Sequence, residues 1–388
     1  MHILFQPNFL DVFFWTLSSY CIVCWINSDN KKYLYFLGIS FGLGVLGKYS
    51  MLFYIAAFGL SVVITNRRKW LANPHFYFAM LIGILICLPN LLWQYEHHFP
   101  LMHHMDLLTR QHQQLLMTIP SFYVWIGGLF YIALNKTGKN YLSLLVIYIA
   151  IIAMLLYFNG KGYYAAAIYP TIMAFGGIGF AGLVMRKGFG WLTWATPMVM
   201  LFITWRILPL FLPNMSPEKL SQFYQSKKYS KPALIWEDKK EHSLPQDFAD
   251  MLGWKEMAEK TAKVYQSLPD SIKQHTMVYG DNYGEAGALS FYGKKLGLPE
   301  IYSDDASYLF WLPDHFTKKY FLFVCDDLPD ADDAFFNHWH KREILDSVTQ
   351  KYAREYRTKI ILYSQPDDSV RIIAEQHIIE GKKQFNFQ

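Results

Sequence analysis

Long runs without any charged side chain are the feature that most constrains the fold of this chain. Residues 76–93 and 117–134 each contain no Asp, Glu, Lys or Arg. About 20 apolar residues suffice for a helix to cross the hydrocarbon core of a bilayer. Such runs are confined to residues 1–210, although the mean hydropathy of the whole chain is only +0.10. The sequence therefore predicts two different parts joined in one chain.

The first part is predicted to be an α-helical, polytopic membrane domain, residues 1–210, with about eight spans. A linker (211–250) joins it to a small α/β domain (251–388). The predicted spans lie near residues 8–26, 33–47, 50–65, 76–93, 117–134, 141–158, 163–185 and 190–210. The second and third spans meet at Gly47–Ser50, where either a tight hairpin or a broken helix would fit.

Basic residues indicate how these spans are oriented. Lys and Arg pairs or triplets fall in every second loop, at Lys31/Lys32, Arg67/Arg68/Lys69, Lys136/Lys139 and Arg186/Lys187. Such residues concentrate in cytoplasmic loops. The other loops and everything after residue 210 are then expected on the opposite side. In a bacterium this means a multi-pass protein of the inner membrane with a periplasmic C-terminal domain. Because this topology accounts for much of the net charge of +5, we do not expect nucleic-acid binding.

Alternating helix and strand patterns predict a layered α/β fold for the C-terminal domain. We expect helices at 254–267 and 284–295 and strands at 276–280, 319–325 and 358–364. The segment GDNYGEAG (280–287) follows a strand and opens a helix, so an anion could bind there, but capping by Asp281 or Asn282 is favoured. The acidic run at 326–333 is read as a solvated loop in preference to a calcium site.

Three ionisable residues are predicted at the outer ends of spans, namely Asp11, Lys48 and Lys161. Charge at membrane depth is expensive and usually functional, and two lysines on one face would suit a phosphate at the headgroup level. The alternative is that the lysines extend to the interface and Asp11 pairs with one of them.

The outer loop that we expect at residues 89–114 contains five histidines. Imidazoles such as His103 and His104, together with Glu96 or Asp106, could hold a divalent metal. The alternative is a hydrogen-bonded interfacial loop anchored at the headgroups by aromatic side chains such as Trp93.

Several segments resemble, in order, bacterial membrane glycosyltransferases of the family 39 type. They are PNFLDVFFW, GLGVLGKYS, PNLLWQYEHHFP and KGYYAAAIYP, with DNYGEAGALSFYGKKLGLP similar to the tail of bacterial members. These enzymes are relatives of protein O-mannosyltransferases and of aminoarabinose transferases. The resemblance implies a GT-C fold and transfer of a sugar from a polyprenyl phosphate to a lipid, glycan or protein acceptor on the outer face of the membrane.

The resemblance also implies roles for single residues. Lys48, Lys161 and Tyr163 would bind the lipid phosphate. His104, with its neighbour His103, would hold a metal ion. The remaining implied positions, in the loop that contacts donor and acceptor, are Trp93, Gln94 and His97.

One departure from the family pattern bears on activity. Family members carry an Asp–Glu pair in their first outer loop, whose Asp is the expected catalytic base, and this chain starts at what resembles the third or fourth family span. We therefore expect a fragment without sugar-transfer activity, with Asp11 and Glu96 as the remaining candidates for the base. The alternative is a non-catalytic, membrane-anchored accessory protein whose periplasmic domain binds a glycan or a partner. A transporter is less favoured because the charges line one surface, not the membrane midplane.

Overall fold

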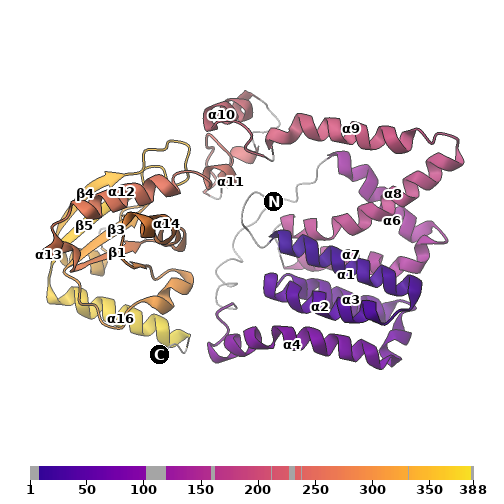
Figure 1. The fold of residues 1–388 in the computed structure, drawn as a ribbon, viewed down its shortest axis with the longest axis horizontal. Helices are drawn as coiled ribbons and strands as arrows, with labels where there is room; N and C mark the ends of the chain where they lie inside the picture. Colours follow the sequence, from indigo (N-terminus) through magenta and orange to yellow (C-terminus); the bar gives the residue numbers. More distant parts are fainter. Residues whose placement is uncertain are drawn as a thin grey trace. The chain divides into compact units, whose positions relative to one another are not determined.

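The structure is a computed structural model that describes residues 8–101, 119–158, 162–210, 212–226, 232–236, 238–330 and 332–385. The chain forms two compact units (Figure 1). Unit 1 comprises Met1–Glu96 and Pro100–Leu208, and unit 2 comprises His97–Phe99 and Pro209–Gln388.

Unit 1 is helical, and a helix lies in each of the eight ranges predicted as spans. The helices are α1 (Asn8–Ser28), α2 (Lys32–Gly47), α3 (Met51–Ile64), α4 (Pro74–Glu96), α6 (Ile119–Leu134), α7 (Leu142–Tyr157), α8 (Tyr169–Arg186) and α9 (Leu192–Ile207). Short 3₁₀ turns lie between them at η1 (Arg68–Ala72), η2 (Gly138–Tyr141), η3 (Gly162–Ala167) and η4 (Leu208–Leu210).

Among the described residues, three helical segments are long and apolar enough to cross a membrane. They are Asn8–Ser28, Pro74–Glu96 and the continuous η2–α7 segment Gly138–Tyr157. These segments identify a membrane protein. That the remaining helices also cross the bilayer stays a prediction.

Close backbone contacts join α2 to α4. Gly38 and Gly42, one turn apart on α2, face Ala79 and Gly83 of α4, and a Cβ at Gly38 would overlap the Ala79 carbonyl. A Cβ at Gly42 would lie 2.8 Å from the Gly83 oxygen. Lipid tails are as apolar as leucine, so helices in a bilayer associate through close packing, which small residues permit.

Close backbone contacts at glycine residues also join α6 to α8. A Cβ at Gly128 of α6 would overlap the Ile172 carbonyl of α8, and a Cβ at Gly176 of α8 would overlap the Val124 carbonyl of α6. Each glycine therefore admits the backbone of the partner helix, and the two contacts together fix where the helices cross.

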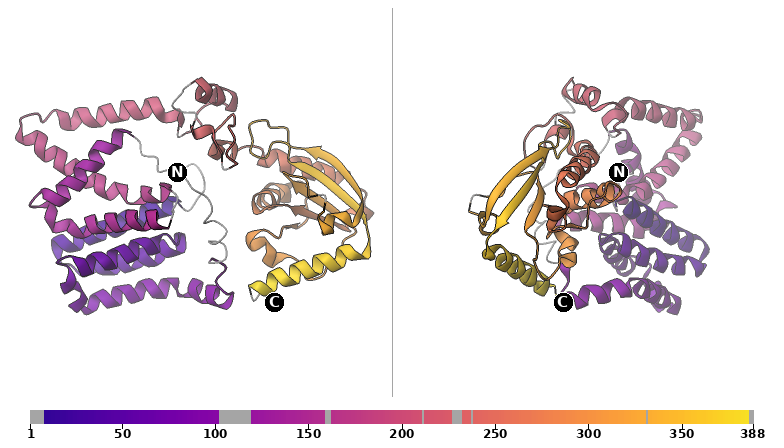
Figure 2. Two further views of the ribbon diagram at one scale, coloured as in Figure 1. Left: turned by 180° about the vertical axis from the view of Figure 1, so that it is seen from behind. Right: turned by 60° about the vertical axis from the view of Figure 1, so that its left-hand side comes forward.

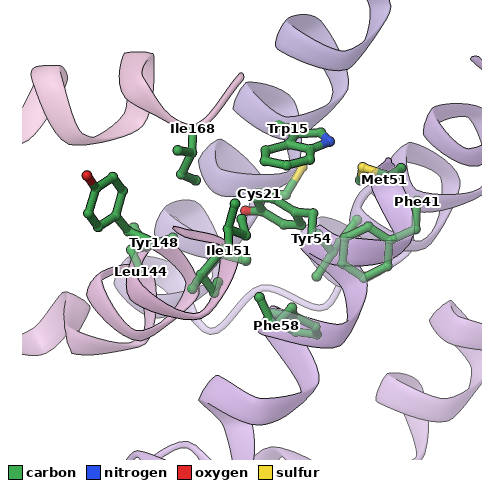
Figure 3. Close-up of a cluster of buried hydrophobic side chains, with 14 of the residues drawn as sticks. Trp15, Cys21, Phe41, Met51, Tyr54, Phe58, Leu144, Tyr148, Ile151 and Ile168 are labelled. Carbon is green, nitrogen blue, oxygen red and sulfur yellow. The ribbon is translucent and has the colours of Figure 1, made fainter. Parts of the chain in front are cut away.

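An aromatic core ties α1 to α2 and α3 (Figure 3). The rings of Trp15 and Tyr54 lie 5.4 Å apart, and those of Phe41 and Tyr54 lie 6.1 Å apart. The Tyr54 hydroxyl is buried but shares a hydrogen bond of 2.7 Å with Ser19 Oγ. The buried phenol of Tyr54 therefore has a hydrogen-bond partner within unit 1.

Unit 2 contains a five-stranded mixed sheet in the order β2-β1-β3-β5-β4. The strands β2, β1 and β3 are mutually parallel, and β5 is antiparallel to β3 and β4. The strands are β1 (Thr276–Gly280), β2 (Ile301–Tyr302), β3 (Tyr320–Cys325), β4 (Trp339–Ser347) and β5 (Lys359–Pro366). The helical segments are α10 (Pro217–Ser226), α11 (Gln246–Ala249), α12 (Trp254–Ser267), α13 (Asp270–Lys273), α14 (Tyr283–Gly293), η6 (Lys294–Leu296), η7 (Ala306–Trp311), α15 (Ala334–Asn337) and α16 (Asp368–Gln384).

Helices cover both faces of this sheet (Figure 2). Successive strand residues point to opposite faces, so Leu322 and Val324 of β3 pack in one cluster with α12 and α14. Phe321 and Phe323 pack in the other cluster, with α16. Unit 2 is therefore a three-layer domain.

The C-terminal helix α16 is also held by polar contacts. Glu375 accepts a hydrogen bond from the Phe316 backbone N–H at 3.2 Å, and His377 Nε2 lies 2.8 Å from Asp304 Oδ2. Lys382 Nζ lies 2.7 Å from Asp314 Oδ1. These contacts anchor the helix along the segments that precede and follow η7.

The predicted strands at 276–280, 319–325 and 358–364 are confirmed to within two residues, as are the helices at 254–267 and 284–295. The sequence patterns did not reveal β4 or α16. The central residues of β4 are largely charged and exposed, as suits an edge strand that must not pair with other chains.

The α6–α8 contact leads to a prediction for two adjacent glycines. Gly176→Ala should lower the free energy of unfolding of unit 1 by about 1–3 kcal/mol, because the methyl group forces α8 away from Val124. Gly177→Ala is the matched control, since a Cβ there meets nothing within 4 Å. SDS-titration unfolding of both variants measures the difference, and equal stability of the two would contradict direct backbone contact.

Candidate functional site

The polar site of unit 1 is built at the break between α2 and α3. Helix α2 ends at Gly47 and α3 begins at Met51. Lys48 caps α2 with an extended backbone (φ −164°, ψ 132°), and its N–H still bonds to the Gly44 carbonyl. The short connection places polar side chains at a helix end, where broken helices of membrane proteins hold ions and charged ligands.

Three groups from different elements surround the Lys48 ammonium. Nζ donates a hydrogen bond to Asn8 Oδ1, lies 3.8 Å from Asp11 Oδ2, and stands 4.0 Å from the ring centroid of Tyr164. Asn8 and Asp11 belong to α1, and Tyr164 belongs to η3. A carboxylate, an amide oxygen and an aromatic face all stabilise a cation, so the ammonium is held at a defined position.

Asp11 is the most enclosed charge of this site. Its side chain is 4% exposed, against 17% for Lys48, and Ser50 Oγ donates to the same Oδ2 that faces the ammonium. An unpaired carboxylate at this depth would be costly. The expected pairing of Asp11 with a lysine is confirmed, and the partner is Lys48.

A second hydrogen-bonded chain joins the same turn to α4. The Tyr49 hydroxyl donates to Asn90 Oδ1 at 2.5 Å, and Gln94 Nε2 donates to the Tyr49 oxygen at 3.2 Å. Gln94 Oε1 accepts from the Leu101 backbone N–H at 3.4 Å. Tyr49 thus fixes the turn that carries Lys48 against the end of α4.

The placement of Trp93, Gln94 and Glu96 in a loop was wrong. Helix α4 continues through Pro89 to Glu96, so all three residues are helical, with Gln94 buried and Glu96 exposed. Proline removes one helical hydrogen bond, which neighbouring groups can compensate in a membrane helix. His97 follows in a turn, before His98 and Phe99 with left-handed backbone conformations (φ 56° and 54°).

The other predicted site residues are only partly described. Lys161, His103 and His104 lie outside the described residues, as does the side chain of Tyr163, whose backbone belongs to η3. Within the described part of the chain, no three His, Cys, Asp or Glu side chains are grouped to hold a metal ion. Metal binding and the shared phosphate site of Lys48 and Lys161 stay predictions.

Sequence reasoning missed four contributors to this site, namely Asn8, Ser50, Asn90 and Tyr164. The sequence could have indicated two of them by their distance from a predicted site residue. Asn8 lies one helical turn before Asp11, and Ser50 lies two residues after Lys48. The others depend on how α4 packs against α2 and η3 packs against α1, which spacing along the chain does not reveal.

A hollow of about 570 Å³ runs along α1. Its lining is almost entirely apolar: Phe9, Val12, Phe13, Thr16, Leu17, Tyr20 and Pro170. It starts beside Asn8, which binds Lys48, and follows the helix for about 16 Å at 1.5 Å per residue. The hollow lies on the more exposed side of α1, away from Asp11.

In unit 2, the segment GDNYGEAG forms a complete capping box at the start of α14. Asn282 Oδ1 accepts from the N–H groups of Gly284 and Glu285, and Glu285 Oε2 accepts from the Asn282 N–H. The preference for capping by Asp281 or Asn282 is confirmed, for Asn282. Burial, followed by the nearby carboxylates of Glu355 and Asp326, raises the pKa of Glu285 to about 9.

Comparison with known proteins gives one match. Residues 1–93 match the family model described as dolichyl-phosphate-mannose-protein mannosyltransferase. This range contains Asn8, Asp11, Lys48, Tyr49, Ser50 and Asn90 of the site, but not Gln94 or Tyr164. No curated protein and no solved structure matches the chain. The match covers 93 of the 388 residues and points to a membrane glycosyltransferase of the GT-C type.

The Asp11–Lys48 pair predicts a non-additive response to mutation. Lys48→Met leaves a buried carboxylate without its cation and should cost about 3 kcal/mol of unfolding free energy. Asp11→Asn should cost less, because Asn8 and Tyr164 still hold the ammonium. The double variant should regain part of the loss. SDS titration of all three variants provides the measurement, and simply additive losses would show that the two groups are not coupled.

Glu285 predicts a pH dependence for unit 2. Its folded pKa of about 9 lies above the ordinary 4.5, so the folded state keeps a proton that the unfolded state releases. Its contribution to stability is therefore complete below about pH 4.5 and is lost as the pH rises toward 9. Glu285→Gln keeps the capping geometry. It should make the urea midpoint of unit 2 less sensitive to pH between about 5.5 and about 8.5, a range that lies between the unfolded and the folded pKa. Proteolysis of residues 276–293 in the full chain reports that midpoint, and an unchanged pH dependence would contradict the assignment.

Proposed function

We propose that this chain is a glycosyltransferase that takes a sugar from a polyprenyl phosphate and passes it to an acceptor on the outer face of the membrane. The observation that carries the proposal is the Lys48 ammonium held by Asn8, Asp11 and Tyr164. It lies within the range that matches the mannosyltransferase family model. The basic-loop pattern supports an outer-face position for this site and a periplasmic position for unit 2.

The proposed reaction is a displacement at the anomeric carbon of the sugar. The acceptor oxygen forms a bond to that carbon, and the bond from the carbon to the phosphate oxygen breaks. The polyprenyl phosphate leaves with the electron pair. A cation fixed before the reaction stabilises the charge that develops on this leaving group. Lys48 is suited to that role because its partners already orient it.

The proton of the acceptor must pass to a general base. Asp11 is poorly suited to this role, since Ser50 and Lys48 both engage its Oδ2 and it is nearly enclosed. We assign Asp11 to the positioning of Lys48 and leave the base unassigned.

The prenyl chain of the donor is proposed to lie in the hollow along α1. The hollow offers no charged group, and its length of about 16 Å is about half of a hydrocarbon core of ~30 Å. Because it begins at Phe9, beside Asn8, a lipid could keep its phosphate near Lys48 while its first isoprene units contact α1.

Lipid binding tests this proposal without requiring turnover. The double variant Asp11→Asn/Lys48→Met removes the cation and keeps the site neutral, so it should fold and bind polyprenyl phosphate at least about tenfold more weakly than the wild type. Lys69→Met, an exposed lysine in η1, is the matched control and should bind normally. Microscale thermophoresis in detergent provides the dissociation constants.

Polyprenol, which lacks the phosphate, serves as the second probe. It should bind the double variant and the wild type equally, and Val12→Trp, which fills the hollow, should weaken both lipids. Wild-type affinity of the double variant for polyprenyl phosphate would overturn the phosphate site.

A further inference from the structure

Aromatic side chains gather on the surface of unit 2 where α14 meets η7. Tyr283 is 61% exposed, Phe291 is 74% exposed and Trp311 is 62% exposed. The rings of Tyr308 and Trp311 meet edge to face at 5.1 Å. Contiguous exposed apolar groups mark binding surfaces, and the contact between Tyr308 and Trp311 joins two rings of this region directly.

The rings border a strip without bulky side chains. Tyr283, Gly287 and Phe291 are successive positions one turn apart on α14, and positions four apart share a helix face. A Cβ at Gly287 would find only the Tyr308 hydroxyl, at 3.8 Å, and that hydroxyl lies 3.5 Å from Ser290 Oγ. The floor between the rings is therefore backbone and two hydroxyl groups. We name Tyr283, Gly287, Phe291, Tyr308 and Trp311 the α14–η7 surface.

The edge of the α14–η7 surface is acidic. Asp305 Oδ2 accepts from the Tyr283 backbone N–H at 3.1 Å, which places a carboxylate beside the Tyr283 end of the strip. Partial desolvation and the nearby carboxylates of Asp326 and Asp304 raise the pKa of Asp281, just before α14, to about 6. Negative charge thus accumulates at this end. Lys294, the first residue of η6, lies about one turn beyond Ser290 and two turns beyond Gly287.

An anionic ligand does not suit the start of α14. The Tyr283 N–H is taken by Asp305, and those of Gly284 and Glu285 are taken by Asn282. No donor of the first turn remains to bind a phosphate, and the acidic residues repel one. The same repulsion disfavours the anionic headgroups of a membrane surface.

We propose that the α14–η7 surface binds a saccharide. A sugar ring has a face of C–H groups, which stacks on aromatic rings, and an edge of hydroxyls, which both donate and accept hydrogen bonds. Tyr283, Phe291 and Trp311 supply the aromatic faces. Asp305 accepts, and the Ser290 and Tyr308 hydroxyls do both. The Gly287 position leaves room for the ring to approach the helix.

That this saccharide is the acceptor, and not a free glycan, rests on the proposed function. In that reading unit 2 holds the acceptor glycan, and unit 1 holds the lipid-linked donor. The binding surface itself is argued from the side chains alone.

Saturation-transfer NMR on the full chain in detergent tests the surface. The probes are hexoses, pentoses, N-acetylhexosamines and their short oligomers. At least one should receive saturation from the aromatic protons of the wild type, with a dissociation constant on the order of 1 mM. Trp311→Ala should weaken that affinity at least about tenfold. Ile372→Ala changes an apolar residue of α16 that is 50% exposed; it is the control and should leave the signal unchanged.

Two results would overturn the saccharide site. One is the absence of transfer to every probe, and the other is an undiminished signal in Trp311→Ala. Hydrogen exchange tests whether the bilayer covers this surface instead. Slower amide exchange of residues 283–296 in nanodiscs than in detergent, without protection by any saccharide, would assign the surface to lipid. Because the experiment needs neither donor nor turnover, its failure leaves the proposed transferase standing, and a failure of lipid binding leaves this surface untouched.

Discussion

Backbone contact between helices is the constraint on which the arrangement of unit 1 depends. Gly38 and Gly42 bring α2 against Ala79 and Gly83 of α4 with no side chain between them. Helices in lipid lack the hydrophobic force that drives association in water, so such contacts must supply specificity. The contact also sets the distance between the ends of α2 and α4. The Tyr49 hydroxyl can donate to Asn90 and accept from Gln94 because that distance is short.

The polar site follows from this geometry. In the turn between α2 and α3, Tyr49 contacts α4, whereas Lys48 and Ser50 contact α1 and η3. There the ammonium meets Asn8, Asp11 and Tyr164. An ion pair of this kind adds little net stability, because its desolvation offsets most of the attraction. Its value lies in holding a charge ready, at a fixed position, for a ligand of opposite charge.

Sequence patterns predicted most of the elements and part of the site. Charge-free runs and basic loops located the eight α-helices that the structure describes in unit 1, and strand patterns located β1, β3 and β5. The edge strand β4 was not predicted because its exposed charged residues obscure the alternation of apolar residues. Lys48 and Asp11 were found because charge near a membrane span is rare.

The residues that were placed wrongly show which contacts cannot be predicted from local sequence patterns. Gln94 was placed in a loop because it lies in a run rich in polar and aromatic residues. In the structure it is helical, and its side chain bonds to Tyr49, which lies 45 residues earlier in the chain. Tyr164 joined the site for a similar reason, because η3 packs on α1. Contacts of this kind arise from tertiary packing, and the sequence shows no periodic pattern that would predict them.

The position of α16 in the chain has a consequence for biogenesis. This helix covers the sheet face formed by Phe321, Phe323 and Tyr363, yet it follows every strand that it covers. During vectorial synthesis that aromatic face is complete before its cover has emerged. Incompletely folded domains expose apolar surface and are prone to aggregate. A holding chaperone in the compartment where unit 2 folds would therefore matter most during the interval between the emergence of β5 and that of α16.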